Sequence, residues 1–356
     1  MCSSDLWAAM APADRKTVLV RWAQLIEDHA DEIALLECLD AGKPITDTSG
    51  GDVPAAARTI RWSGEAIDKV YDQVAPTPAN CLALVQRLPL GVVAAIVPWN
   101  FPIEIILNKL GPLLAMGNTC VLKPAPDTPW NATRLGRLIA EQTDIPPGVV
   151  NIVTSADHLV GEVLSTSAEV DMVAFTGSTA TGRRILEAAA PTLKRVFLEL
   201  GGKSVNLVLD DADLEATLAG SAVCCMHGGQ GCAIPTRLLV PRSHYDEAVE
   251  MARTAFENWA YGDPTDLSVL QGPQISRRQQ ERVLDYIQQG RAEGATVVTG
   301  GGRPDHLDRG WYVEPTLFAD VDNAMVIAQE EIFGPVLRSE GRPVGKECSS
   351  RRPPDH

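Results

Sequence analysis

Residues 91–100 read GVVAAIVPWN, a short apolar run that stops at proline, tryptophan and asparagine. An apolar run of this length, bounded by glycine and proline, is typical of a strand that is buried on both faces. Three more runs of this kind follow, and each run precedes a stretch with helical spacing, the crossover that parallel strands need. The repeats therefore predict a parallel sheet with helices on both faces, a doubly wound architecture of the nucleotide-binding type. The later runs are NTCVLK (118–123), VVNIV (149–153) and DMVAF (171–175).

The chain on either side of these repeats has a different pattern. Upstream, apolar residues at helical spacing predict helices across 12–66, and a looser pattern with two prolines across 73–90 favours a protruding ribbon. Downstream, further strands and helices predict a second α/β domain. We therefore expect a dinucleotide-binding domain over 1–200 and a second domain over 201–337. Residues 338–356 are rich in arginine, proline and serine, which predicts a disordered tail.

The composition argues against several classes of function. The chain has 356 residues and a formal net charge of −15, so it repels nucleic-acid phosphates and anionic lipid surfaces. Its first residues lack the basic start and apolar core of a signal peptide, and no apolar stretch is long enough to span a membrane. We therefore expect a cytoplasmic protein with reduced thiols and with no nucleic-acid or membrane partner. The eight cysteines include no C-x-x-C pair, so we expect no metal site.

Six separated motifs are the most specific signal in the sequence. The motifs are VPWNFP (97–102), LKPAPDTP (122–129), FTGSTATG (175–182), LELGGKS (198–204), GGQGC (228–232) and EEIFGPV (330–336). They occur in the order in which they are found in the aldehyde dehydrogenase superfamily, which the chain closely resembles from about residue 10 to 337. The resemblance implies a doubly wound cofactor domain, a second α/β catalytic domain, and NAD(P)-dependent oxidation of an aldehyde to a carboxylic acid.

The resemblance assigns four residues to catalysis. Cys232 matches the nucleophile, which attacks as a thiolate, and the glycines beside it would leave room for the substrate and the nicotinamide. The side-chain amide of Asn100, with the backbone N–H of Cys232, would stabilise the oxyanion. Glu199 matches the general base that activates water, and Lys109 would influence its proton path. From the residues alone, a buried thiol, a turn asparagine and an exposed strand glutamate are alternative interpretations.

The expected cofactor is NAD, although the chain contains no G-x-G-x-x-G fingerprint. Gly177 and Ser178 instead open a helix after a strand, where backbone N–H groups favour a pyrophosphate. By the resemblance, Gly182 would allow close helix packing and Lys123 would reach the adenosine ribose. Position 126 is proline, where many family members carry a glutamate that binds the ribose 2′-hydroxyl, so NADP stays open as an alternative. The residues assigned to the cofactor are Ile96, Val97, Pro98, Trp99, Lys123, Gly177, Ser178, Gly182, Leu200, Glu331 and Phe333.

The implied reaction needs no metal. Cys232 attacks a small-molecule aldehyde to form a thiohemiacetal, hydride passes to the nicotinamide, and water activated by Glu199 hydrolyses the resulting thioester. Intact family members are homo-oligomers. They also begin earlier and continue beyond EEIFGPV, so we expect a truncated chain whose catalytic domain is incomplete at its C-terminal end. The alternatives are a non-catalytic remnant that keeps only nucleotide-binding parts and, less favoured, a thiol acyltransferase.

Overall fold

The computed structural model describes residues 3–342 of the chain. These residues form two compact units, each of which is described by itself. Unit 1 runs to Gly201 and also includes Pro264–Leu267, while unit 2 contains Gly202–Asp263 and continues from Ser268. The excursion Pro264–Leu267 is tied to the rest of unit 1 through the backbone, because the N–H of Ile45 donates to the carbonyl of Pro264 at 2.8 Å.

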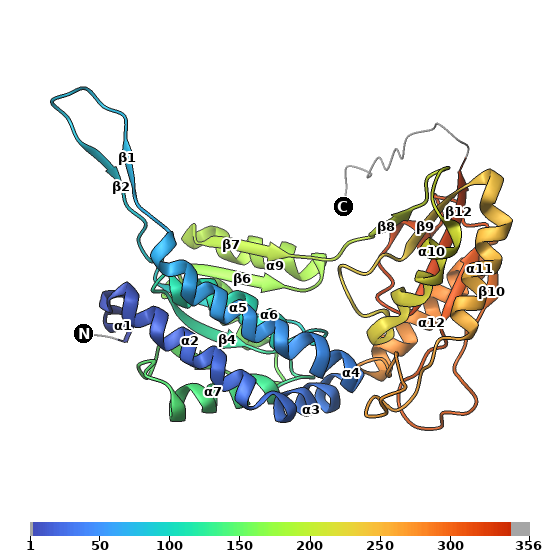
Figure 1. Cartoon of the computed structure of the whole chain (residues 1–356), viewed down its shortest axis with the longest axis horizontal. Coiled ribbons are helices and arrows are strands. Elements are labelled where there is room, and N and C mark those ends of the chain that lie inside the picture. The colour runs from blue at the N-terminus through green and yellow to red at the C-terminus, as the bar shows by residue number, and fades with distance from the viewer. Residues whose placement is uncertain (1–2, 343–356) are drawn as a thin grey trace. The chain divides into compact units, whose positions relative to one another are not determined.

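Unit 1 is built on a five-stranded sheet. Its strands are β3 (Val92–Ile96), β4 (Thr119–Lys123), β5 (Val150–Ile152), β6 (Met172–Thr176) and β7 (Arg195–Glu199). All neighbouring strands pair parallel, which confirms the predicted parallel sheet (Figure 1). The order β5-β4-β3-β6-β7 shows that the chain first winds outward from β3 and then returns to its other side. The topology is therefore doubly wound, with its switch point between β3 and β6.

Helices cover both faces of this sheet. Because successive residues of a strand point to opposite sides, each strand contributes to a core on each face. Val93 and Ala95 of β3 belong to a large core, whereas Ala94 belongs to a second, smaller core on the other face. Burial on both faces explains why the strands are continuously apolar. The smaller core lies under α8 (Leu159–Thr166) and α9 (Thr179–Ala189). The large core takes residues from α1 (Ser3–Ala9), α2 (Pro12–Asp28), α3 (Ala30–Ala41), α5 (Val53–Ala66), α6 (Pro102–Ala115) and α7 (Trp130–Gln142).

Several short elements complete unit 1. Within 73–90, β1 (Gln73–Ala75) and β2 (Ala83–Val85) pair antiparallel as a hairpin that extends away from the sheet (Figure 1). The helix α3 ends at Gly42, whose φ of 68° is left-handed and turns the chain toward α4 (Ile45–Asp47). The remaining elements are the π-helix η1 (Thr48–Asp52) and the short 3-10 helices η2 (Ile67–Lys69) and η3 (Ala190–Thr192).

Unit 2 contains a second sheet of five strands. These are β8 (Val205–Leu207), β9 (Arg237–Pro241), β10 (Thr296–Thr299), β11 (Thr316–Ala319) and β12 (Val336–Arg342), in the order β10-β11-β12-β9-β8. Only β10 and β11 pair antiparallel among these neighbours, so the sheet is mixed. Its helices are α10 (Leu214–Ala219), η4 (Ser221–Gly229), η5 (Arg242–His244), α11 (Tyr245–Glu257), α12 (Arg277–Ala292) and α13 (Val326–Gln329).

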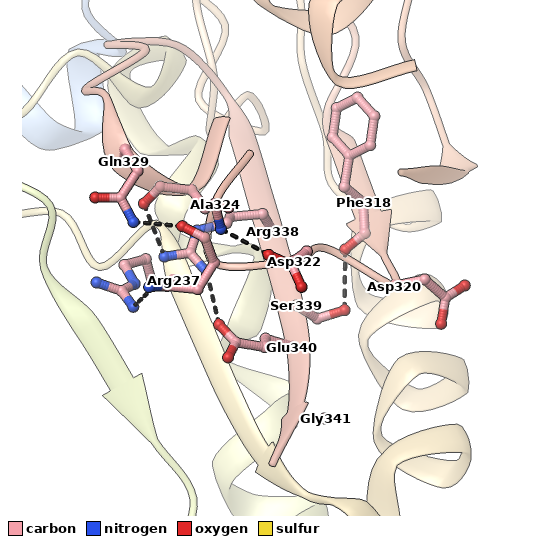
Figure 2. A network of polar contacts seen from close by, with 12 residues as sticks. Arg237, Phe318, Asp320, Asp322, Ala324, Gln329, Arg338, Ser339, Glu340 and Gly341 are labelled. Atoms are coloured by element: carbon pink, nitrogen blue, oxygen red, sulfur yellow. Dashed lines mark hydrogen bonds and ion pairs between the residues drawn. The ribbon is translucent and has the colours of Figure 1, made fainter. Parts of the chain in front are cut away.

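The strand β12 corrects the predicted disordered tail. We expected disorder from residue 338, yet Arg338–Arg342 pair with β9 in the middle of the sheet, and Arg338 and Ser339 are fully buried. The backbone explains the difference: β11 pairs with the start of β12, up to Arg338, and β9 pairs with Arg338–Arg342, through hydrogen bonds that do not depend on the side chains. Ser339 Oγ also donates to the carbonyl of Phe318 at 2.9 Å (Figure 2). The rest of the predicted tail, 343–356, lies outside the described residues.

The described residues show neither a membrane-spanning helix nor a cluster of metal-ligating side chains. Across residues 3–342, no helix combines the length and the apolar character needed to cross a membrane. In the same part of the chain, no group of three or more histidine, cysteine, aspartate or glutamate side chains is arranged to hold a metal ion.

Candidate functional site

The switch point of the unit 1 sheet gathers most of the residues that the sequence assigns to the cofactor. In open parallel sheets, ligands bind outside the carboxyl ends of the strands at this point. Ile96 ends β3, Lys123 ends β4 and Thr176 ends β6. The residues that follow these ends are Val97, Pro98, Trp99 and Asn100 after β3, Gly177 and Ser178 after β6, and Leu200 after β7.

The start of α9 has the features of an anion-binding helix terminus. Ser178 is its N-cap, and the Ser178 hydroxyl accepts the N–H of Thr181 at 3.3 Å. Gly177 donates its backbone N–H to the carbonyl of Glu199 at 3.0 Å, which fixes the turn against β7. A Cβ on Gly182 would lie 2.8 Å from Leu200 Cδ2, so a glycine is needed for this helix to approach the strand end. These residues fit a pyrophosphate at the helix N-terminus.

Lys123 and Lys109 are two lysines of unit 1 with limited access to water. Lys123 is 7% exposed, and its Nζ donates to the carbonyl of Pro124 at 3.2 Å. Burial lowers the pKa of Lys123. Lys109 of α6 has its Nζ 5.6 Å from the centre of the Phe197 ring. Burial lowers the pKa of Lys109 to about 8, and the charge of Glu199 opposes that shift, so Lys109 and Glu199 interact electrostatically.

Asn100 and Glu199 differ in their surroundings. Asn100 is 3% exposed, in the turn between β3 and α6. A buried amide is held by its neighbours and can present its donors in a fixed direction. Glu199 ends β7 with an exposed side chain, which is the environment of a carboxylate in contact with water. The turn asparagine is therefore buried, and the strand glutamate is exposed.

Cys232 differs in exposure from the other two cysteines in the described part of unit 2. Cys224 and Cys225 are buried in η4, whereas Cys232 is exposed. The alternative of a buried core thiol at position 232 is therefore wrong. The thiol follows a loop in which His227 has a φ of 50°, a left-handed value that non-glycine residues rarely adopt.

The glycines before Cys232 have a packing reason. A Cβ on Gly229 would lie 2.0 Å from the carbonyl oxygen of Gly334, so the two backbone segments touch directly. Gly228 has a φ of 64° and lies against Gln274, whose Nε2 donates to the carbonyl of Gly228 at 2.8 Å. The loop is thus in direct contact with the backbone of Gly334, and it is hydrogen-bonded to the side chain of Gln274.

Gln230 fixes the last turn before the thiol. Its side chain is fully buried, and its Nε2 donates to the carbonyl of His227 at 2.9 Å. Its Oε1 accepts the backbone N–H of Ile275 at 2.9 Å. The sequence places Gln230 beside Cys232, but nothing local indicates Gln274 or Ile275, because more than forty positions separate them from the loop. Only the fold brings these residues together.

Glu331 and Phe333 belong to the segment of unit 2 in which the backbone of Gly334 touches this loop. Glu331 Oε1 accepts the backbone N–H of Gly202 at 3.2 Å, and burial raises the pKa of Glu331. Phe333 has a φ of 62° and its carbonyl accepts Gln279 Nε2 at 2.7 Å. A bulky residue in the left-handed region is strained, and such strain is found at functional sites.

Comparisons with known proteins agree on one family. The model of the aldehyde dehydrogenase family matches residues 3–339. The NADP/NAD-dependent aldehyde dehydrogenase PuuC of Escherichia coli is 43% identical over 334 residues, which is 93% of this chain and 66% of PuuC. The putative aldehyde dehydrogenase DhaS of Bacillus subtilis is 42% identical, again over 93% of this chain and 66% of its own length. The chain thus spans about two thirds of the length of these curated relatives.

Solved structures give the same result. An indole-3-acetaldehyde dehydrogenase AldA of P. syringae, in complex with NAD+ and IAA, matches with a TM-score of 0.93 and 46% identity. That match covers 96% of this chain and 69% of AldA. The aldehyde dehydrogenase KauB of Pseudomonas aeruginosa matches with a TM-score of 0.93 and 45% identity, covering 96% of this chain and 69% of KauB.

Proposed function

Because the chain belongs to the aldehyde dehydrogenase family, we propose that it oxidises an aldehyde to a carboxylic acid with NAD as the hydride acceptor. The observation that carries the proposal is Cys232. It is an exposed thiol at the end of a loop that is locked by buried glutamine side chains. A nucleophile must be accessible and held in position; Cys232 is exposed, and hydrogen bonds of Gln230 and Gln274 hold the loop that precedes it.

The cofactor part of the proposal rests on the switch point of unit 1. Gly177 and Ser178 at the start of α9 would hold the pyrophosphate, and Lys123 would reach the adenosine ribose. Glu331 would contact the nicotinamide ribose and Phe333 the ring. The nicotinamide supplies a two-electron hydride acceptor when it is bound. Several structural relatives are complexes with NAD+ by name, which favours NAD for this chain.

The protein's own groups perform the remaining steps. The thiolate of Cys232 adds to the aldehyde carbon, and the carbonyl electrons move to the oxygen, where the amide of Asn100 stabilises the negative charge. Departure of hydride from this thiohemiacetal leaves a thioester on Cys232. Glu199 then accepts a proton from water, and the water oxygen displaces the thiolate to give the carboxylic acid. The charge of Lys109 would influence the proton path of Glu199.

The environment of the chain is a further part of this proposal. The described residues contain six cysteines, and no disulfide joins any two of these six, which is the usual state in a reducing compartment. We therefore propose a cytoplasmic location. The proposed substrate is a small molecule.

The test is NADH formation by the purified chain with a panel of aromatic and aliphatic aldehydes, together with NAD and NADP binding. Phenyl and indole acetaldehydes come first, because the P. syringae relative is by name an indole-3-acetaldehyde dehydrogenase. The proposal expects NADH with at least one aldehyde and its loss in Cys232→Ala, while NAD binding persists. Nucleotide binding without NADH formation from any aldehyde favours the non-catalytic alternative, and the same activity in Cys232→Ala contradicts the assigned nucleophile.

A further inference from the structure

The helix α6, which starts two residues after Asn100, begins without a cap of its own. Its N-cap residue, Phe101, provides no side-chain hydrogen bond, and Pro102 at the first position has no N–H to offer. The backbone N–H of Ile103 is therefore one of the groups that a helix start leaves without an intrahelical partner. Because Ile103 is fully buried, water cannot satisfy that group.

A carboxyl group from another helix takes the place of the missing cap. Glu37 of α3 accepts the N–H of Ile103 at 3.1 Å through Oε1. A negative charge or carboxyl dipole at this position also suits the positive end of the helix. The two residues are 66 positions apart in the chain, so only the packing of α3 on α6 makes the contact.

Glu37 is itself held in place. Its side chain is fully buried, and Asn131 of α7 donates a hydrogen bond to its second oxygen. Asn131 Nδ2 also lies 3.2 Å from the carbonyl of Ile33, one turn earlier in α3. Burial raises the pKa of Glu37 to about 8, and the nearby charge of Asp52 adds to this effect. Three helices thus converge on a single carboxyl group.

A second anchor holds the residue before the helix. Lys43 Nζ lies 3.5 Å from the centre of the Phe101 ring, a cation–π contact in a buried setting. Lys43 is 1% exposed and pairs with Asp52 Oδ2 at 2.5 Å, so its ammonium group cannot move away. Two more carboxyl groups, Asp47 and Glu104, have raised pKa values through burial and interact with the Lys43 charge.

We propose that Glu37 and Lys43 are positioning residues for Asn100, because together they fix the segment 101–103 and with it the amide that stabilises the oxyanion. The inference rests on the proposed function, which gives Asn100 its role. The turn 97–101 is short: the β3 ladder fixes its start, and the Glu37 and Lys43 contacts fix its end. Displacement of a catalytic donor by about 1 Å can cost ~10²-fold in rate, so the anchors matter for turnover.

The test compares two substitutions of Glu37 in the full chain. Glu37→Leu removes the acceptor for the Ile103 N–H, whereas Glu37→Gln keeps an oxygen there. For each variant, three quantities are measured at a temperature well below the unfolding transition. They are the amide hydrogen exchange of the peptide 97–105, the rate of single-turnover NADH formation, and the affinity for NAD. We expect Glu37→Leu to speed exchange of this peptide and to slow NADH formation ~10- to 100-fold, with NAD affinity changed less than about twofold. Glu37→Gln should remain close to the wild type.

A control and a double variant separate positioning from general stability. Ile26→Ala creates a cavity in α2, lowers stability and should leave the rate unchanged. In an Asn100→Ala background, Glu37→Leu should cause no further slowing, because there is no longer an amide to place. Slowing by the full factor in that background overturns the inference, and so does unchanged exchange of 97–105.

Two more outcomes are informative. If Glu37→Leu does not fold, Phe101→Leu takes its place, because it removes the ring beneath Lys43 and leaves the helical hydrogen bonds of α6 intact. We expect the same faster exchange of 97–105 and the same slower NADH formation. If neither change is seen, the inference is overturned. A wild-type rate in Asn100→Ala contradicts the proposed function and, with it, the positioning role. Absence of NADH in the wild type contradicts the proposed function alone, and hydrogen exchange then decides whether Glu37 anchors the segment.

Discussion

The side-chain oxygen of Gln230 accepts the backbone N–H of Ile275 at 2.9 Å, which ties the loop before Cys232 to the segment before α12. The amide nitrogen of the same side chain donates to the carbonyls of His227 at 2.9 Å and Pro273 at 3.4 Å. One buried residue therefore joins the start of the last turn before the proposed nucleophile to the segment 273–275. Positions of this kind determine how precisely a thiol is presented to its substrate.

Substitution of Gln230 by leucine should destabilise unit 2 and alter the presentation of Cys232. The change leaves the Ile275 N–H and the His227 carbonyl without their partner, and buried polar groups in that state cost ~1–3 kcal/mol each. We expect a loss of ~2–4 kcal/mol in urea unfolding followed by tryptophan fluorescence. Gln230→Glu keeps the acceptor for Ile275 but sets a carboxyl oxygen against the carbonyls of His227 and Pro273, so it should be destabilised as well. Equal stability of Gln230→Leu and the wild type would show that the buried amide does not hold the loop.

Lys109 should shape the pH dependence of the reaction. Its pKa is lowered to about 8 by burial, below the ordinary 10.5, so it loses its charge as the pH rises through 8. The unfolded chain then holds this proton more tightly than the folded chain, so the group destabilises the fold fully below pH 8 and less as the pH approaches 10.5. We expect the rate of the wild type to change between about pH 7 and 9, and we expect this pH-dependent change to be absent in Lys109→Met. Lys109→Arg, which stays charged, should also lose it; superimposable profiles for all three proteins would rule out the role.

Glu37 should make the stability of unit 1 depend on pH. Its pKa is raised from 4.5 to about 8, so the folded chain binds the proton more tightly than the unfolded chain. The stabilising contribution is complete below pH 4.5 and is lost as the pH rises to about 8, at up to ~1.4 kcal/mol per pH unit. The difference in unfolding free energy between wild type and Glu37→Gln isolates this group from Asp47, Asp52 and Glu104. A difference that stays constant from pH 5 to 8 contradicts the assignment.

The ion pair between the buried Arg338 and the half-buried Glu340 should not be a source of stability. Arg338 is fully buried, its Nη1 is 3.5 Å from Glu340 Oε2, and its Nη2 donates to the carbonyl of Ala328 at 3.1 Å (Figure 2). Desolvation of a guanidinium is costly, and an ion-pair contact of 3.5 Å offsets little of that cost. The double variant Arg338→Met/Glu340→Val should be neutral or more stable by ~1–4 kcal/mol. Glu340→Val alone should be destabilised, because it leaves the Arg338 charge buried without its carboxylate; a strongly destabilised double variant would contradict this interpretation.

The sequence predicted the parallel sheet well because its signal is local. Runs such as VAAI in β3 are apolar at every position, and each is followed by a helical pattern, which together indicate a strand buried on both faces. It could not predict β12 beyond Leu337. Arg338, Ser339 and Glu340 have no strand pattern of their own, and their place is determined by the β9 and β11 backbones on either side.

The site was predictable only in part for the same reason. Cys232, Asn100 and Glu199 lie in short motifs that can be read from the chain directly. Glu37 and Gln274 lie in no such motif, and their roles come from contacts 66 and 46 positions away. Such supporting residues are recognised only once the fold brings distant helices and loops together.

The most direct test of the central claim is mass spectrometry of the chain after rapid mixing with NAD and an aldehyde that yields NADH. If Cys232 is the nucleophile, the peptide that contains it gains the mass of an acyl group, and Glu199→Gln increases the amount of this adduct by slowing its hydrolysis. NADH formation with the acyl group on another cysteine, or with Cys232 unmodified in both proteins, would contradict the account.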